Sequence, residues 1–113
     1  MSQRTKFLKV DDCPEVCLRD LDIAAKRYKL SRRAAFLGVY RAVDLRRAVV
    51  AGQMIETPGG SASFGIHVEP DVHSNYKRVA QSLGVKMSQV GRLLMISQHH
   101  RFVEILRNRE VNS

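Results

Sequence analysis

The sequence carries one helical pattern twice, and this duplication constrains the fold more than any other feature. Five residues of the first half and five of the second share the spacing i, i+4, i+7, i+8 and i+11, at one constant offset. This spacing places each set on one face of a helix. The two sets are Cys17, Leu21, Ala24, Ala25 and Tyr28, and then Val72, Tyr76, Val79, Ala80 and Leu83.

Matching elements flank both helical patterns. An alternating run precedes each pattern, at residues 6–10 and 64–68, and such alternation is typical of a strand. A serine follows each pattern, Ser31 or Ser88, and can cap a second apolar helix. The predicted unit is therefore strand, helix, helix, present twice. A unit of about 45 residues is too small to bury a core alone, so we expect the two copies to pack their apolar faces together.

Capping and turn residues set the expected boundaries. Asp12 can cap a helix whose first turn contains Pro14, which predicts a first helix over residues 14–28. A strongly apolar second helix is expected over residues 32–50. The Thr-Pro-Gly-Gly-Ser stretch at residues 57–61 breaks regular structure and provides a linker. We therefore expect a single domain over residues 1–113, made of a first unit at 5–50, a linker at 51–62 and a second unit at 63–107.

The charge balance favours a polyanion as partner. The chain has 19 Lys and Arg against 11 Asp and Glu, which gives a net charge of +8 on a composition with 44% hydrophobic residues. A globular protein this basic is typical of nucleic-acid binding rather than of recognition of a small neutral substrate. No apolar run approaches the roughly 18 residues of a membrane span, and no signal peptide is recognisable. We expect a cytoplasmic protein.

No group of residues indicates an enzyme, a cofactor or a metal site. Cys13 and Cys17 are spaced C-x-x-x-C without further ligands for zinc, so we interpret them as reduced, partly buried thiols. His99 and His100 are adjacent and would point in different directions on a helix. No paired carboxylates, Ser/His/Asp set or phosphate-binding loop can be assigned to a shared site. The sequence therefore predicts a non-enzymatic protein without cofactor or metal.

Two DNA-binding architectures fit the pattern. Residues 79–94 resemble a helix-turn-helix, with Ala80, Gly84, Val90 and Leu93 at the spacing of its core. The first half does not match that motif, because Lys29 stands at the turn glycine and Gly38 at a core position. A helix-turn-helix regulator using residues 79–94 remains an alternative.

The duplicated strand-helix-helix pattern resembles the ribbon-helix-helix family of the MetJ/Arc type, over residues 5–106. In that family two chains pair their strands into an antiparallel ribbon that enters the DNA major groove. Here one chain resembles two fused copies, a single-chain pseudo-dimer similar to the C-terminal domain of the overdrive-binding virulence proteins of the VirC operon. The resemblance implies a mainly α fold with a two-stranded antiparallel ribbon and the element order β-α-α-β-α-α. It also implies an accessory role in DNA transfer or processing, of the T-DNA or conjugation type.

The resemblance assigns base contacts to the outward face of the ribbon. Matching Val10 with Val68 directs Leu8 and Ile66 inward, whereas a slip of one residue would turn Phe7 inward and Lys6 outward. The outward positions, which the family uses to contact base edges, are Thr5, Phe7, Lys9, Ser63, Gly65 and His67.

Phosphate contacts are expected at the starts of the second helices, where free N–H groups and the positive end of the helix dipole favour anions. The strand entrance adds further cations. The expected phosphate-binding residues are Arg4, Lys6, Lys29, Ser31, Arg32, Arg33, Lys86, Ser88 and Gln89.

The expected partner is double-stranded DNA, bound by a monomer that acts as a pseudo-dimer. Because the two copies differ, the DNA site need not be palindromic. The resemblance also implies a relaxase or partition-type protein as a second partner. A basic adaptor that binds an acidic protein, with incidental DNA binding, is a further alternative.

Overall fold

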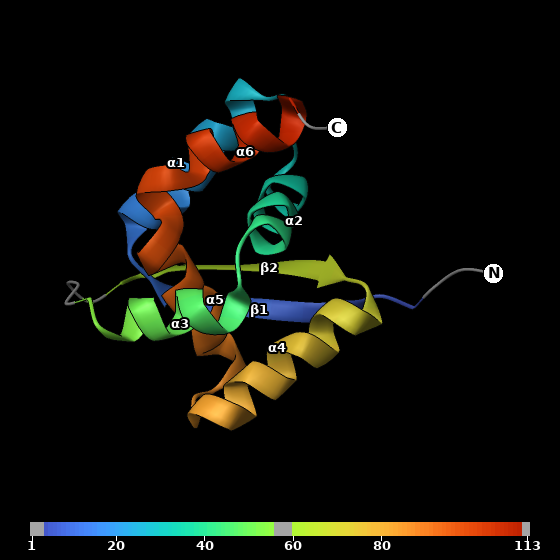
Figure 1. The fold of residues 1–113 in the computed structure, drawn as a ribbon, viewed down its shortest axis with the longest axis vertical. Coiled ribbons are helices and arrows are strands. Elements are labelled where there is room, and N and C mark those ends of the chain that lie inside the picture. The colour runs from blue at the N-terminus through green and yellow to red at the C-terminus, as the bar shows by residue number, and fades with distance from the viewer. Residues whose placement is uncertain (1–3, 56–59, 112–113) are drawn as a thin grey trace.

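Two antiparallel strands lie at the centre of the fold, in a computed structural model that describes residues 4–55 and 60–111 (Figure 1). Strand β1 spans Lys6–Cys13 and strand β2 spans Ala62–Val68. Leu8 pairs with Ile66, and the pairs on either side run from Lys6 with Val68 to Val10 with Phe64. The two segments lie far apart in the sequence, so the chain must close on itself before they can pair.

Helices make up most of the chain and follow each strand in groups of three. The expectation of a mainly α fold with a two-stranded antiparallel ribbon is confirmed. The observed order in the described residues is β-α-α-α-β-α-α-α, which has one helix more in each half than the predicted β-α-α-β-α-α. The helices are α1 (Glu15–Arg27), α2 (Arg32–Ala42), α3 (Leu45–Gln53), α4 (Pro70–Leu83), α5 (Met87–Gln98) and α6 (Phe102–Val111), with a short 3₁₀ helix, η1 (His99–Arg101), between α5 and α6.

The prediction of one continuous helix over residues 32–50 is wrong. Val43 adopts an extended conformation and ends α2, and Asp44 then begins α3 by accepting a hydrogen bond from the Arg47 backbone N–H (3.0 Å). The second half is interrupted at the matching place, because His99 follows Asp44 at the offset that separates Cys17 from Val72. The duplication therefore extends through a third helix.

Each third helix packs against the second helix of the other half. Helix α3 lies along α5, and α6 lies along α2. The approach of α3 to α5 is close at Gly52, since a Cβ there would lie 2.9 Å from the carbonyl carbon of Leu93 and nearer still to its oxygen. The break between α2 and α3 allows this reciprocal packing, which a straight helix over residues 32–50 could not reach.

The serine caps were predicted correctly in one half only. The Ser31 hydroxyl accepts a hydrogen bond from the Ala34 N–H (3.0 Å) and caps α2. The prediction for Ser88 is wrong, because Lys86 occupies the N-cap of α5 and its backbone N–H donates to Oε1 of Gln89 (3.2 Å). Lys86, not Ser88, follows Ser31 at the offset that relates the two helical patterns.

The first strand is longer than predicted, and Asp12 is not a helix cap. Pro14 occupies the N-cap of α1. Asp12 lies in β1 with φ of +54°, where the ribbon register shifts between Val10 and Cys13. The Asp12 carbonyl accepts a hydrogen bond from Nε of Arg92 on α5 (2.8 Å), which ties the irregular end of β1 to the core. In the second half Val68 leads directly into Glu69, the N-cap of α4.

The predicted linker overlaps regular structure at both ends. Residues 51–53 belong to α3 and residue 62 begins β2. Residues 56–59, which include Pro58 and Gly59, lie outside the described residues. Gly84 ends α4 in the left-handed conformation, with φ of +67°.

The apolar residues form one core between the ribbon and the helices. Both helical patterns contribute to this core, and all of their members are buried except Tyr28 and Leu83, which are half-buried. Among the helices of the described ranges, none is both long and apolar enough to cross a membrane.

Candidate nucleic-acid interface

The ribbon has one buried and one exposed face. Leu8, Val10 and Ile66 are 0–5% exposed, whereas Phe7, next to Leu8 in β1, is 56% exposed. The alternative register, with Phe7 turned inward, is therefore wrong. The structure brings all six predicted base-facing residues together on the exposed side of neighbouring segments, namely Thr5, Phe7, Lys9, Ser63, Gly65 and His67.

One end of this exposed face is aromatic. The Phe7 ring meets the His67 ring edge to face, with centroids 5.2 Å apart. The same ring lies over Gly65, where an added Cβ would come within 2.6 Å of Cε1 of Phe7. Thr5 Oγ1 lies 3.5 Å from Nδ1 of His67. The absence of a side chain at Gly65 therefore allows Phe7 to lie across the ribbon.

The other end is polar and includes a carboxylate that the sequence analysis missed. Nζ of Lys9 lies 3.5 Å from Oδ1 of Asp11, and the Ser63 hydroxyl donates to the same oxygen (3.2 Å). The Lys9 side chain is 61% exposed. The alternation of outward residues 5, 7 and 9 continues to residue 11, and this signal was available in the sequence.

Two of the predicted phosphate ligands are engaged with groups of the protein. The Arg32 guanidinium donates two hydrogen bonds to the Asp22 carboxylate, at 3.0 and 2.9 Å, and these raise the pKa of Arg32. Nε of Arg33 donates to the His67 carbonyl (2.6 Å), and Nη2 lies 3.5 Å from the Glu69 carboxylate. Both arginines also lie close to β2, because the Arg32 guanidinium stacks 5.6 Å from the centre of the Phe64 ring.

The other predicted phosphate ligands differ in solvent exposure and in whether they already contact groups of the protein. Ser88 is half-buried on the first turn of α5, and the Gln89 side chain accepts from Lys86. Four of the predicted phosphate-binding cations are exposed and make no ion pair within residues 4–55 and 60–108: Arg4, Lys6, Lys29 and Lys86.

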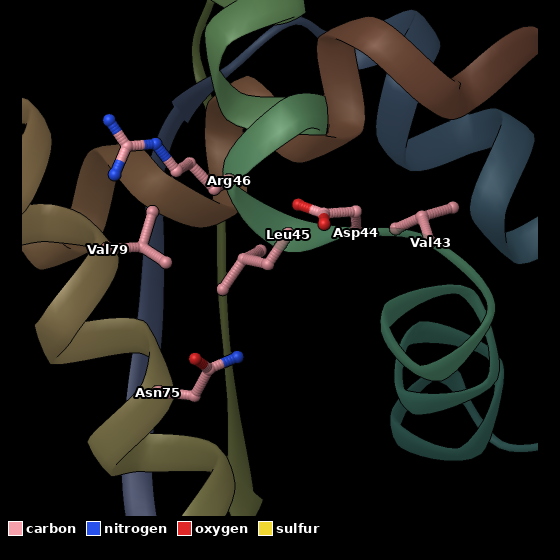
Figure 2. A pocket seen from close by; sticks show the side chains of 6 residues that line it. All are labelled: Val43, Asp44, Leu45, Arg46, Asn75 and Val79. Carbon is pink, nitrogen blue, oxygen red and sulfur yellow. The ribbon is translucent and has the colours of Figure 1, made fainter.

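A shallow hollow of about 280 Å³ lies between the start of α3 and helix α4 (Figure 2). Its polar side chains serve the fold. Asp44 caps α3, and the Asn75 amide donates to the Tyr40 hydroxyl (2.8 Å). The remaining polar side chain of the lining is Arg46, beside Val43, Leu45 and Val79. Among the described residues that line the hollow, Asp44 is the one acid and Arg46 the one base.

The two cysteines lie side by side in the core. Cys13 and Cys17 are 0% and 1% exposed, so they are more buried than expected. Interaction with the neighbouring Cys13 thiol lowers the pKa of Cys17 to about 7, and interaction with Cys17, together with burial, raises the pKa of Cys13. The Cys13 thiol itself donates to the Pro14 carbonyl (3.6 Å). Nδ1 of His99 lies 2.6 Å from the Asp20 carboxylate nearby. Within the described residues, no three side chains of His, Cys, Asp or Glu converge as a metal site would require.

Comparison of the chain with family models, with curated proteins and with solved structures finds no match. A functional assignment must therefore come from the geometry and charge of the ribbon and of the helix starts beside it.

Proposed function

We propose that this protein binds double-stranded DNA by placing the exposed face of the β1–β2 ribbon in the major groove. The observation that carries the proposal is the ribbon itself. It is anchored by the buried Leu8 and Ile66 on one side and presents Phe7, Lys9 and His67 to solvent on the other. A two-stranded ribbon fits the width of the major groove, and these side-chain types can contact base edges there.

We interpret the two halves as fused ribbon-helix-helix units, each extended by a third helix. The ribbon register is centred on the Leu8–Ile66 pair, so that Val10 and Val68, both 0% exposed, occupy equivalent positions. The reciprocal packing of α3 on α5 and of α6 on α2 supports the same two-fold relation. The third helices depart from the simple family pattern and contribute to the shared core.

Phosphate contacts would supply much of the affinity. The net charge of +8 favours association with a polyanion, and each phosphate contact releases bound counterions. Lys29 and Lys86, near the starts of α2 and α5, are exposed and can reach phosphates without breaking an ion pair. Arg32 would have to exchange Asp22 for a phosphate, so its contribution is smaller than its charge suggests.

The geometry favours the ribbon over a helix-turn-helix. A recognition helix must present one face to the bases, and in residues 79–94 that helix would be α5. Val90, Gly91 and residues 93–97 of α5 are buried, against β1 and α3. Among the described residues of α5, Gln89 is the one with an exposed side chain that could contact bases. Its side chain already accepts a hydrogen bond from the Lys86 backbone N–H.

The accessory role in T-DNA or conjugative transfer, in the cytoplasm and with a relaxase or partition-type partner, depends on the family resemblance alone. The basic surface is equally compatible with an acidic protein partner. Competition by duplex DNA of mixed sequence separates the two functions, because an adaptor without DNA binding would ignore the duplex.

The direct test is an electrophoretic shift series with short duplexes at rising salt. We expect the wild-type chain to bind at low salt, and Lys9→Ala to weaken binding more than Arg107→Ala. Arg107 is exposed on α6, outside the ribbon, so its replacement removes the same charge and serves as the control. Absence of duplex binding by the wild-type chain at low salt would refute the proposal. Equal losses from the two variants would refute the role of the ribbon.

A further inference from the structure

The two ends of the ribbon face differ chemically, although the strand pairing is symmetric. The register places equivalent positions of the two halves at opposite ends of the ribbon. Two identical units would therefore present the same groups at both ends. Here Phe7 and His67 occupy one end, whereas Lys9, Asp11 and Ser63 occupy the other.

From this asymmetry, and on the basis of the function proposed above, we propose that the ribbon reads a non-palindromic DNA site in one orientation. Asp11 is its specificity-determining residue, and it selects a G·C pair together with Lys9. The aromatic end reads thymine methyl groups.

The polar end matches the edge of a G·C pair. Guanine presents N7 and O6 as acceptors in the major groove, and cytosine presents the N4 amino group as a donor. Nζ of Lys9 is a donor 3.5 Å from the acceptor oxygen of Asp11, so the two side chains offer the complementary pattern at short range. The Ser63 hydroxyl donates to Asp11 at 3.2 Å and holds its carboxylate across the ribbon.

A carboxylate on a DNA-binding face repels phosphates, so its favourable role there is to accept from a base. Asp11 and Glu69 occupy equivalent positions of the two halves. Asp11 lies two residues after the outward Lys9, and Glu69 lies two residues after the outward His67. The Glu69 carboxylate is drawn towards α2, where it lies 3.5 Å from Arg33 and 3.9 Å from Arg41. The first half instead extends β1 through Asp11 to Cys13 before the helix begins. The acidic group is therefore present at one end of the face.

At the aromatic end the exposed face presents the Phe7 and His67 rings, with the Thr5 hydroxyl beside His67. Phe7 lies flat over Gly65, and apolar contact with the thymine methyl is the contact available to a phenyl ring in the major groove. A side chain at Gly65 would displace the Phe7 ring from the ribbon without deleting it.

Selection from a library of random duplexes, followed by affinity measurement on the enriched site and its base-pair variants, tests the proposal. We expect the wild-type chain to enrich a non-palindromic site with a G·C pair at one end. Asp11→Ala should lose about tenfold discrimination at that pair, in line with one good base contact. It should also bind random duplex more tightly, because a negative charge is removed. Phe7→Ala should weaken the thymine preference and leave the G·C preference intact, because Phe7 pairs with His67 and not with a residue of the polar end.

The control is Asp71→Ala, which removes an exposed carboxylate from the first turn of α4. It should raise affinity for random duplex without changing the preferred sequence. A purely structural role for Asp11 would lower affinity for all duplexes alike, and this result would overturn the inference. A palindromic enriched site, or an unchanged G·C preference in Asp11→Ala, would also overturn it while the wild-type chain still binds DNA. Failure of the wild-type chain to bind any duplex would instead refute the proposed function.

Discussion

The close approach of α3 to α5 makes Gly52 the most informative position for a test of the fold. Replacement of a helical glycine by alanine ordinarily stabilises a helix by about 0.5–1 kcal/mol. At Gly52 the new Cβ would overlap the backbone oxygen of Leu93, which cannot rotate away as a side chain could. The two helices would have to separate by about 1 Å, and overpacking of this kind costs about 1–3 kcal/mol. The clash outweighs the helix propensity.

We therefore expect Gly52→Ala to lower the free energy of unfolding by about 1–2 kcal/mol. Urea denaturation followed by far-ultraviolet circular dichroism measures the change. With a typical m-value of about 1.5 kcal/mol/M, the midpoint should fall by about 1 M. The comparison is Ala51→Gly, at an exposed neighbour in α3, which should lose about 0.5–1 kcal/mol from helix propensity alone.

A Gly52→Ala variant as stable as the wild-type chain, or more stable, would refute this reasoning. That result would mean that α3 does not rest on the α5 backbone. The packing of α3 on the second helix of the other half would then lack its closest contact, which joins Gly52 to the Leu93 backbone.

Three further predictions concern buried groups and charge. The Tyr76 side chain is 0% exposed, and its hydroxyl has no hydrogen-bond partner in the described residues. Tyr76→Phe should therefore leave the free energy of unfolding unchanged or raise it by up to about 1 kcal/mol, which thermal unfolding can measure. The pKa of Cys17 is lowered to about 7 from 9.0, so its thiolate should stabilise the fold increasingly from about pH 7 to 9 and lose this effect below pH 7. Cys13→Ala should move the 240 nm thiolate titration of Cys17 to higher pH, and an unmoved titration would exclude Cys13 as the cause of the lowered pKa. The logarithm of DNA affinity should fall with the logarithm of salt concentration, with a slope of about −4 if Arg4, Lys6, Lys29 and Lys86 contact phosphates and of about −5 if Arg32 and Arg33 join them. A slope near zero would exclude phosphate-driven binding.

Local sequence signals identified the elements that depend on near neighbours. The spacing of Leu21 and Tyr76 within their helical patterns predicted the buried faces of α1 and α4, and alternation around Leu8 and Ile66 predicted the two faces of the ribbon. Gly84 marked the end of α4 because a left-handed residue there favours glycine. These features follow from backbone geometry over a few residues.

The sequence predicted six residues of the exposed ribbon face but missed a seventh, and it did not predict the ion pairs around them. All six base-facing positions lie together as expected, yet Asp11 was missed because the strand was taken to end at Val10. The engagement of Arg32 by Asp22 was also not foreseeable, because it joins two helices whose relative placement depends on the core. An arginine near a helix start is available to phosphate only if no carboxylate reaches it first.

The sequence by itself determined that the chain contains a duplicated strand and helix pattern, with a basic surface and an apolar face on each helix. Tertiary structure alone decided that the second helix breaks at Val43, that α3 and α6 exchange partners, and that Asp22 engages Arg32. The physical reason is the distance along the sequence over which each interaction acts. Periodicity and capping act over one or two turns, whereas a helix break is favourable only when the resulting segments find buried contacts elsewhere in the chain.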